Sequence, residues 1–304
     1  MKSPVLMIVF CRPDTTEKVL ESVRNARPPK LYVAADAPRS DKPGEEAKCR
    51  QVLNLFDKID WPCEVHFFRQ QKNLGCSKGP YEAISWFFEH EEEGIILEDD
   101  IVPIPSFFTY CDEMLERYRK NEKIQSISGW SYFYNDPPKD YQYSYYYSKI
   151  TSSWGWATWR RAWKDIDLKL ENISRDVIKD RLTKYGFPRS TKKLYLSYFD
   201  RIRTKYDALQ SWDYQFLFSM WIKDRYVIQP IHSMTMNIGF TEGATHRFNE
   251  SISRHPTKDI YPIKYPSNID YLKCLDLIRI KNEKLFWHSK LYWKFFGLIK
   301  KIGL

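Results

Sequence analysis

The sequence predicts an α/β protein with a mostly parallel β-sheet and helices on both faces. Two observations predict this fold. Segments typical of strands alternate regularly with segments of helical periodicity from residue 4 to residue 130. The first strand segment, PVLMIVF, is a continuous apolar run, as expected of a strand that is covered on both faces. Regular alternation of this kind favours parallel strands joined by helical crossovers.

The predicted elements of this first part follow one another in a fixed order. Strands are predicted at residues 4–10, 30–36, 63–69, 94–100 and 124–130. Helices are predicted between them at residues 14–26, 44–59, 78–93 and 105–121. In the first helix, for example, Asp14 or Thr15 can serve as the N-cap, and apolar residues then recur at helical spacing.

The alternation stops after Trp130. The following segments are a Tyr-, Trp- and Ser-rich stretch (131–163), a polar helical stretch (172–208), an amphipathic helix led by Ser211 and Asp213 (209–225) and a pair of strands (226–240). No internal repeat or low-complexity linker separates them. We therefore expect one domain over residues 1–250, with halves at 1–130 and 131–250, followed by an extension over residues 251–304.

The net charge of +9 is concentrated in this extension. Residues 251–304 contain eleven Lys or Arg and four Asp or Glu, so they carry +7 of the total. The first 250 residues are nearly neutral, which argues against a nucleic-acid-binding face. Residues 284–304 predict a basic amphipathic helix with embedded Trp, which suits the surface of an anionic membrane. Docking of this helix on the protein body is the alternative.

The cysteines and the apolar segments bear on localisation. The six cysteines are scattered and form no CxxC pair, which argues against a zinc site and indicates reduced thiols in the cytosol. The apolar run near the N-terminus is too short for a signal peptide, and no stretch approaches the ~20 apolar residues of a membrane helix. We expect a cytoplasmic protein that lies peripherally at the inner face of the plasma membrane.

Three consecutive acids, Glu98, Asp99 and Asp100, end the fourth predicted strand. Along a strand, Glu98 and Asp100 face one way and Asp99 faces the other. Like charges this close raise one another's pKa unless a cation offsets them. Carboxylates with water and phosphate oxygens form a usual Mg²⁺ or Mn²⁺ site, which is one interpretation. The other is that Asp99 and Asp100 cap the helix that begins near Pro105.

Other polar residues also lie at predicted strand ends, where α/β sheets bind ligands: Arg12, Asp36 and the segment RQQKNLG. In chain order, Asp36, NLG, LEDD, WGWATWRRAW, WD and GATH resemble the motifs of GT-A nucleotide-sugar glycosyltransferases. More narrowly, the sequence is similar to the N-acetylglucosaminyltransferase I family and its bacterial relatives, over roughly residues 4–250. The most specific part is LEDDIVPIPSFFTYCDEMLERY.

The resemblance implies a GT-A, Rossmann-like fold with a C-terminal helical extension. The half over residues 1–130 then binds the nucleotide sugar, and the half over 131–250 binds the acceptor and carries the catalytic residue. By this resemblance, Asp100 binds Mn²⁺ or Mg²⁺ as the last acid of its motif. Glu98 and Asp99 support it through hydrogen bonds or water.

The resemblance also implies which residues contact the nucleotide. Asp36 corresponds to an acid that contacts the base of UDP, and Arg12 to a nucleotide-contacting position after the first strand. Asn73 and Lys78 fall where related enzymes approach the nucleotide.

Four further positions concern catalysis, the diphosphate or metal, and the sugar. Asp213 corresponds to the catalytic base, although an Asp in the first turn of a helix is also favoured by the helix dipole. His246, in GATH, matches a His that touches the diphosphate or the metal, or it is structural. Trp154 and Trp156 either stack on a sugar or pack in the core.

The activity that the resemblance implies is a metal-dependent, inverting transfer of a hexosyl or N-acetylhexosaminyl group. The expected donor is a nucleoside diphosphate sugar with UDP as its nucleotide, and the expected acceptor is a hydroxyl of a glycan or lipid-linked acceptor in bacterial surface polysaccharide synthesis. Two alternatives remain. A sugar nucleotidyltransferase usually has a Gly-rich loop after the first strand, where this chain reads CRPDTT. A non-catalytic sugar- or membrane-binding protein would not need the acids at 36, 100 and 213.

Overall fold

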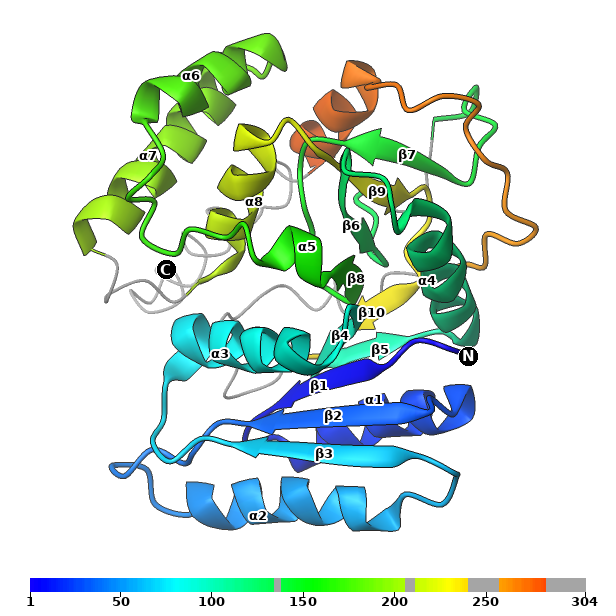
Figure 1. Ribbon diagram of the computed structural model, residues 1–304, viewed down its shortest axis with the longest axis vertical. Helices are drawn as coiled ribbons and strands as arrows, with labels where there is room; N and C mark the ends of the chain where they lie inside the picture. The colour runs from blue at the N-terminus through cyan, green and yellow to red at the C-terminus, as the bar shows by residue number, and fades with distance from the viewer. Residues whose placement is uncertain (134–137, 206–210, 240–256, 283–304) are drawn as a thin grey trace, which may run out of the picture.

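The computed structural model describes residues 1–133, 138–205, 211–239 and 257–282. An eight-stranded sheet in the order β3-β2-β1-β4-β8-β6-β9-β7 forms the centre, and a second sheet pairs β10 with β5 (Figure 1). The strands are β1 (Val5–Val9), β2 (Lys30–Ala35), β3 (Glu64–Arg69), β4 (Glu93–Glu98), β5 (Ile101–Pro103), β6 (Ile124–Ser128), β7 (Tyr145–Ser148), β8 (Trp156–Trp159), β9 (Tyr226–Pro230) and β10 (Thr235–Asn237).

Helices cover both faces of the central sheet. They are α1 (Pro13–Ala26), α2 (Glu45–Leu55), the short 3₁₀ helix η1 (Phe56–Lys58), α3 (Gly75–His90), α4 (Pro105–Tyr118), α5 (Arg160–Trp163), α6 (Arg175–Lys184), α7 (Arg189–Lys205) and α8 (Asp213–Ile222). Alternate residues of each buried strand pack into different layers, as the pleat requires. In β1, Val5 and Met7 pack with α1, α2 and α4, whereas Leu6 packs with α3.

The predicted α/β fold is confirmed. All nine elements predicted over residues 4–130 are present, and β1 to β4 form the parallel half of the sheet. Four of the seven neighbouring pairs in the central sheet are parallel. The other three involve β8 or β7, which the sequence does not predict. Both are four residues long, too short for a periodic pattern to stand out from the surrounding Tyr and Trp.

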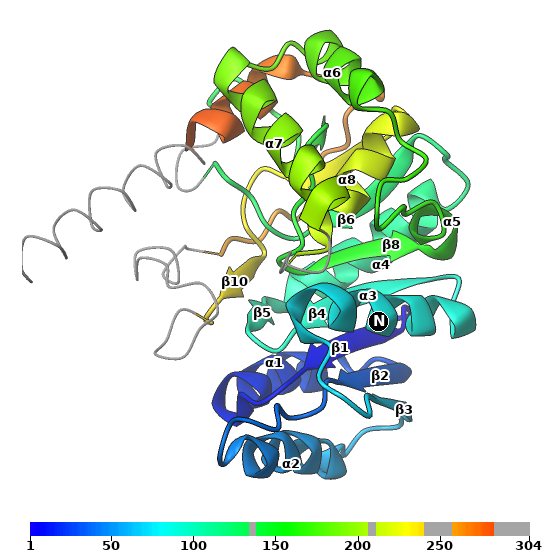
Figure 2. The same cartoon turned by 90° about the vertical axis from the view of Figure 1, so that its left-hand side faces the viewer.

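The helix predicted at residues 209–225 is present as α8, but it is not amphipathic. Its residues from Gln215 to Trp221 are all buried. Phe218 packs in a cluster with α6 and α7, and Phe216 packs in the cluster beneath α3. The helix therefore lies between two layers of the protein (Figure 2), so no face of it needs to be polar.

Residues 257–282 pack on the body of the protein and close the β7 edge of the sheet. Ser144 N donates to Lys264 O over 2.9 Å, and Tyr147 forms a bridge with Tyr271. The buried side chains of Asp276 and Arg279 then bind the loop after β7: Asp276 accepts from Lys149 N, and Arg279 donates to the carbonyls of residues 150 and 151. The division at residue 250 stays a prediction.

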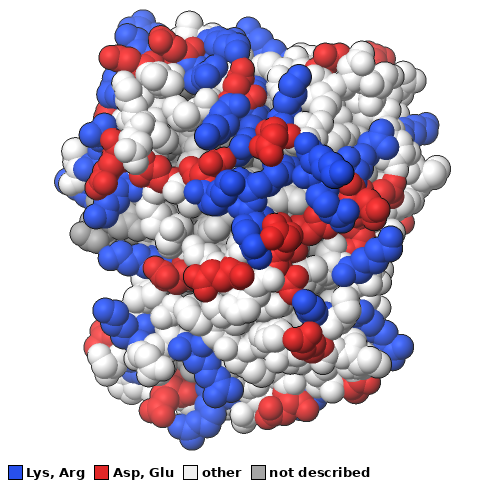
Figure 3. Space-filling view, in the orientation of Figure 1, with Lys and Arg blue, Asp and Glu red and all other residues white. Residues whose placement is uncertain are grey.

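Two sequence predictions fall outside the described residues: His246 and the basic helix over residues 284–304. Within the described ranges, no helix is both long and apolar enough to span a membrane. On the face shown in Figure 3, Lys and Arg side chains gather in a band across the middle of the molecule, and Asp and Glu side chains border and interrupt it. Arg119 with Glu93 and Arg160 with Glu92 are ion pairs of this kind.

Candidate functional site

A cavity of about 500 Å³ opens at the carboxyl ends of β1, β2 and β4. Its lining comes from those strand ends, from β3 and from the start of α3. The lining residues used below are Phe10, Arg12, Asp36, Arg39, Phe68, Asn73, Glu98 and Asp99. This is the edge at which a doubly wound sheet binds its ligand. Three of the four residues predicted from the sequence to contact the nucleotide therefore meet here with two of the three acids, Glu98 and Asp99.

The three acids lie at the end of β4, but only Glu98 belongs to the strand. Asp99 and Asp100 form a turn, and β5 begins at Ile101. The guanidinium of Arg12 binds both turn residues: Nη1 donates to Asp100 Oδ2 over 2.9 Å, and Nη2 donates to Asp99 Oδ1. The expectation that Asp99 and Asp100 face opposite ways is therefore wrong, because the alternation of a strand does not extend into a turn.

Two of these acids have raised pKa values. Burial, together with the charges of Asp100 and Asp99, raises the pKa of Glu98 to about 8. Burial also raises the pKa of Asp99 to about 6, although Arg12 and the backbone N–H of Phe10 favour its charged form. The site thus holds two buried carboxyls, Asp99 and Asp100, bound to one guanidinium, with the partly buried Glu98 beside them.

One carboxylate oxygen in the turn lacks a partner. Asp100 Oδ1 is buried and accepts no hydrogen bond from the part of the chain that the structure describes, whereas Oδ2 is bound to Arg12. A buried polar atom of this kind is costly unless a ligand or water completes it. The alternative that these acids cap the following helix is wrong, because α4 begins after Ile104 without any side-chain N-cap.

The backbone after β10 covers Asp100. Ile238 N donates to Asp100 O over 2.8 Å, which extends the pairing of β10 with β5. A Cβ placed on Gly239 would lie 2.0 Å from Asp100 Oδ2 and 2.9 Å from Arg12 Nη1. Only a glycine can therefore pass this close to the ion pair. The sequence predicts no role for Gly239, since only the folded chain brings it to Asp100.

Asp36 joins the end of β2 to the start of α3. Its carboxylate accepts hydrogen bonds from the backbone N–H groups of Ala37, Leu74 and Gly75, over 2.9 to 3.1 Å. Burial raises its pKa, and these three donors counteract that shift. Asn73 Nδ2 donates to Ala37 O over 2.7 Å and tightens the same junction. Asp36 thus shapes the cavity wall, and three donors leave it little capacity for a ligand.

Lys78 lies differently. It is exposed on α3 and does not line the cavity. A cation that the sequence does not predict, Arg39, does line it. Arg39 Nε donates to both carboxylate oxygens of Glu45 over 3.1 Å, and its Cζ lies 5.6 Å from the centre of the Phe10 ring. No motif marks this pair, because Arg39 lies in a loop and Glu45 begins α2.

Asp213 begins α8, and it does not line the cavity. Ser211 Oγ donates to Asp213 Oδ1, and Ser77 Oγ on α3 donates to Ser211 O over 3.2 Å. The start of α8 is therefore tied to the helix that borders the cavity. The charge of Asp213 also reaches Glu98, whose pKa it helps to raise.

The two tryptophans weighed as sugar platforms differ in burial. Trp156 is 2% exposed and stacks on Trp212 with 5.5 Å between ring centres, so it belongs to the core. Trp154 is half-buried and lies edge-on to Trp130. Stacking of Trp154 on a sugar stays a prediction.

The fit of a divalent cation rests on Asp100. In the part of the chain that the structure describes, no three His, Cys, Asp or Glu side chains gather as a metal site. The unpartnered Asp100 Oδ1 is nevertheless a hard oxygen ligand of the kind that Mg²⁺ and Mn²⁺ prefer. The chain offers few ligands, so a diphosphate and water would have to supply the others. His246 lies outside the described residues.

No family model and no curated protein matches the sequence. Solved structures that resemble the fold include S. aureus TarS residues 1–349, with 10% identity over 75% of this chain and 57% of that chain and a TM-score of 0.41. The glycosyltransferase GlyE of Streptococcus pneumoniae has 10% identity over 75% of this chain and 45% of that chain, with a TM-score of 0.37. Mouse xyloside xylosyltransferase 1 has 14% identity over 72% of this chain and 81% of that chain, with a TM-score of 0.35. The chain spans about half the length of the two bacterial proteins. At these TM-scores the likeness assigns no family.

Proposed function

We propose that the protein is a glycosyltransferase that uses a nucleoside diphosphate sugar. The observation that carries this proposal is the ion pair of Arg12 with Asp99 and Asp100 at the mouth of a 500 Å³ cavity. A guanidinium with two N–H groups aimed at oxygens suits a diphosphate, and the cavity beside it has room for a nucleoside. We further propose UDP as the nucleotide and a glycan or lipid-linked hydroxyl as the acceptor.

In this proposal the nucleoside lies between the ends of β1 and β2. Phe10 and Phe68 supply apolar walls, and Arg39 supplies a charged donor that Glu45 holds in place. Asn73 and Asp36 fix the loop that closes the far side. The diphosphate then extends toward Arg12 and Asp100, where strand ends and a cation-binding oxygen meet.

The proposed chemistry is a single displacement. The acceptor oxygen forms a bond to the anomeric carbon as the bond from that carbon to the diphosphate oxygen breaks, and UDP leaves with the electron pair. Asp213 accepts the proton of the acceptor hydroxyl. Asp100, with Glu98 and Asp99 around it, would hold Mn²⁺ or Mg²⁺, which when bound neutralises charge on the leaving diphosphate. Direct displacement inverts the anomeric carbon.

The first test is a search for the donor. Thermal unfolding is measured with Mn²⁺ and a panel of nucleotide sugars, and the correct donor should raise the Tm by mass action. Release of UDP, with or without added acceptor, then identifies transfer or slow hydrolysis. Formation of a nucleoside triphosphate from pyrophosphate would instead identify a nucleotidyltransferase. No effect of any nucleotide would support the non-catalytic alternative.

The second test concerns the catalytic base. Asp213→Asn should lower transfer by about 100-fold or more while leaving UDP affinity nearly unchanged. Asp180→Asn, an exposed change on α6, is the matched control and should leave transfer unchanged. Weak UDP binding with retained turnover in Asp213→Asn would sink the assignment.

Attachment to the membrane is a separate proposal, since it rests on residues 284–304. Electrostatic attraction and burial of apolar side chains would together hold this segment at an anionic membrane surface. Surface polysaccharide would be synthesised at this surface. Deleting residues 284–304 should move the protein to the soluble fraction of a cell lysate. Unchanged sedimentation with the membrane would contradict the proposal.

A further inference from the structure

The turn of Asp99 and Asp100 is already occupied by a cation of the chain itself. Of its four carboxylate oxygens, three have partners in the structure. Arg12 binds Asp99 Oδ1 and Asp100 Oδ2, and Phe10 N donates to Asp99 Oδ2 over 3.2 Å. The fourth, Asp100 Oδ1, is buried and has no partner among the described residues. A cation bound at Oδ1 would therefore share the Asp100 carboxylate with the guanidinium on Oδ2.

The space around Asp100 is also closed. Gly239 lies so near that a single added carbon would meet Asp100 Oδ2 at 2.0 Å and Arg12 Nη1 at 2.9 Å. Ile238 N holds this backbone in place through its bond to Asp100 O. A cation cannot bind Oδ2 while Arg12 and Gly239 keep these positions. Two positive groups on one carboxylate would also repel each other at close range.

A nucleoside diphosphate offers Arg12 a different partner. Its phosphate oxygens accept the same paired N–H geometry that the two aspartates accept now. The side chain of Arg12 is 34% exposed and lines the cavity, so it can turn toward a ligand there. The side chains of Asp99 and Asp100 are 3% and 11% exposed and are fixed in a turn, so they cannot follow it.

We propose that Arg12, bound to Asp100 Oδ2 in the free protein, opposes cation binding to this carboxylate and leaves it for the donor diphosphate, so that nucleotide and cation bind cooperatively. This inference rests on the proposed function, and it assigns Arg12 a switching role rather than contact alone. A cation alone must displace a paired guanidinium that gains no new partner. With UDP present, Arg12 keeps its hydrogen bonds and Asp100 becomes available. By linkage, each ligand then strengthens the other by the same factor.

The test measures Mn²⁺ binding to the full-length protein by electron paramagnetic resonance of the free ion. Wild-type protein should bind Mn²⁺ weakly alone, and saturating UDP should tighten the affinity by about 5- to 150-fold, the usual range of coupling between sites. Arg12→Met should bind Mn²⁺ at least about 5-fold more tightly than wild type without nucleotide, and its coupling to UDP should fall toward 1.

Two control variants keep the result interpretable. Arg175→Met removes an arginine that pairs with Asp200 on the surface, and it should leave Mn²⁺ binding unchanged. Arg12→Lys keeps the charge but loses the paired donors, so its Mn²⁺ affinity should lie between those of wild type and Arg12→Met. Circular dichroism establishes that each variant is folded before titration.

The outcomes separate the inference from the proposed function. Weaker Mn²⁺ binding by folded Arg12→Met would overturn the inference, since it would mean that Arg12 only positions Asp100. Independent binding of UDP and Mn²⁺ to the wild type would also overturn it, while leaving a glycosyltransferase possible. No binding of UDP at all would overturn both. Tighter Mn²⁺ binding by Arg12→Met supports the inference even before a donor sugar is known.

Discussion

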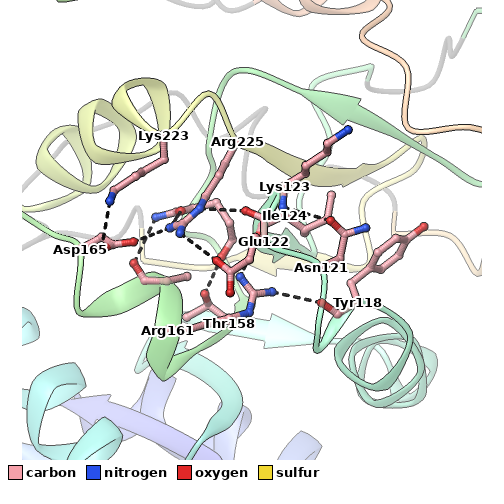
Figure 4. A network of polar contacts seen from close by, with 12 residues as sticks. Tyr118, Asn121, Glu122, Lys123, Ile124, Thr158, Arg161, Asp165, Lys223 and Arg225 are labelled. Atoms are coloured by element: carbon pink, nitrogen blue, oxygen red, sulfur yellow. Dashed lines mark hydrogen bonds and ion pairs between the residues drawn. The ribbon is translucent and has the colours of Figure 1, made fainter.

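Two arginines of this protein, Arg225 and Arg12, bind acids in opposite ways. Arg225 lies at the start of β9 with a side chain that is 8% exposed, and its three donor groups are all used (Figure 4). Nε donates to Glu122 O over 2.9 Å, Nη1 to Asp165 Oδ2 over 2.7 Å and Nη2 to Glu122 Oε2 over 3.2 Å. Arg12, by contrast, faces a cavity and leaves Asp100 Oδ1 unpartnered beside it.

The two clusters differ in whether the protein's own residues complete their hydrogen bonds. Around Arg225, the neighbouring Arg161 gives its three donor groups to backbone carbonyls of residues 118, 119 and 124, and Lys223 lies 3.7 Å from Asp165. This network joins α4, α5, β6 and β9 and has no need of a ligand. Around Arg12, buried carboxyls outnumber the guanidinium, so a ligand that brings positive charge can complete the cluster.

The largest expected effect is the removal of Arg225. Arg225→Met leaves Asp165 partly buried without its main partner, so the free energy of unfolding should fall by about 3 to 5 kcal/mol. Urea denaturation at pH 7 measures this. Arg175→Met, which breaks an exposed pair, should cost only about 0 to 1 kcal/mol. An equally small loss for Arg225→Met would erase the contrast between the two arginines.

A smaller effect is expected from crowding Asp100. Gly239→Ala brings a carbon against Asp100 and Arg12, and such overpacking costs about 1 to 3 kcal/mol of unfolding free energy. Gly79→Ala is the matched control, because its new carbon would lie 3.4 Å from the nearest atom and the position is helical. The control should cost less than the variant at 239, since its only strain is that of an alanine before Pro80 in a helix. Equal behaviour of the two variants would show that the backbone at 239 yields freely.

The smallest expected effect, counted per pH unit, is the dependence of the free energy of unfolding on pH. The folded protein holds the pKa of Glu98 at about 8, above the ordinary 4.5, so it keeps a proton that the unfolded chain releases. This contribution is fully present below pH 4.5 and is lost as the pH rises through 8, by at most about 1.4 kcal/mol per pH unit. Urea unfolding between pH 5 and 9 in a chelator measures it.

The matched variant for this slope is Glu98→Gln, which cannot titrate. Its stability should change less with pH over the same range, while the Arg225 network contributes equally to both proteins. A slope that is the same in the variant and the wild type would place the titrating group elsewhere and weaken the contrast between the two clusters.

The sequence predicts the parts of this protein that depend on local pattern. The parallel strands and their helices follow from apolar runs and spacing, and the acids at 98–100 follow from the end of such a run. The orientation of Asp99 and Asp100 is not predictable in this way, because the same two residues can either continue a strand or form a turn. The hydrogen bonds from the start of α3 to Asp36 are also not predictable from local pattern. The donating N–H groups of Leu74 and Gly75 are separated from Asp36 in the chain by a helix and a strand.

Contacts between distant segments account for the rest. The contact of Gly239 with Asp100 and the contact of Arg39 with Glu45 both depend on how the folded chain brings these residues together. No spacing in the sequence predicts either contact. The sequence predicts that α8, led by Ser211 and Asp213, is amphipathic, whereas the folded helix is buried from Gln215 to Trp221. Only the presence of packed layers on both sides explains why that helix has no polar face.

The covering of β7 by residues 257–282 decides where this chain can be shortened. A chain cut before residue 257 would lose the bond of Ser144 to Lys264 and the buried Asp276, and it would expose the β7 edge to pairing with other molecules. A chain that ends at Asn282 keeps all of these contacts. A chain shortened for crystallisation should therefore not end before Asn282. Labels and fused proteins should be attached after this residue.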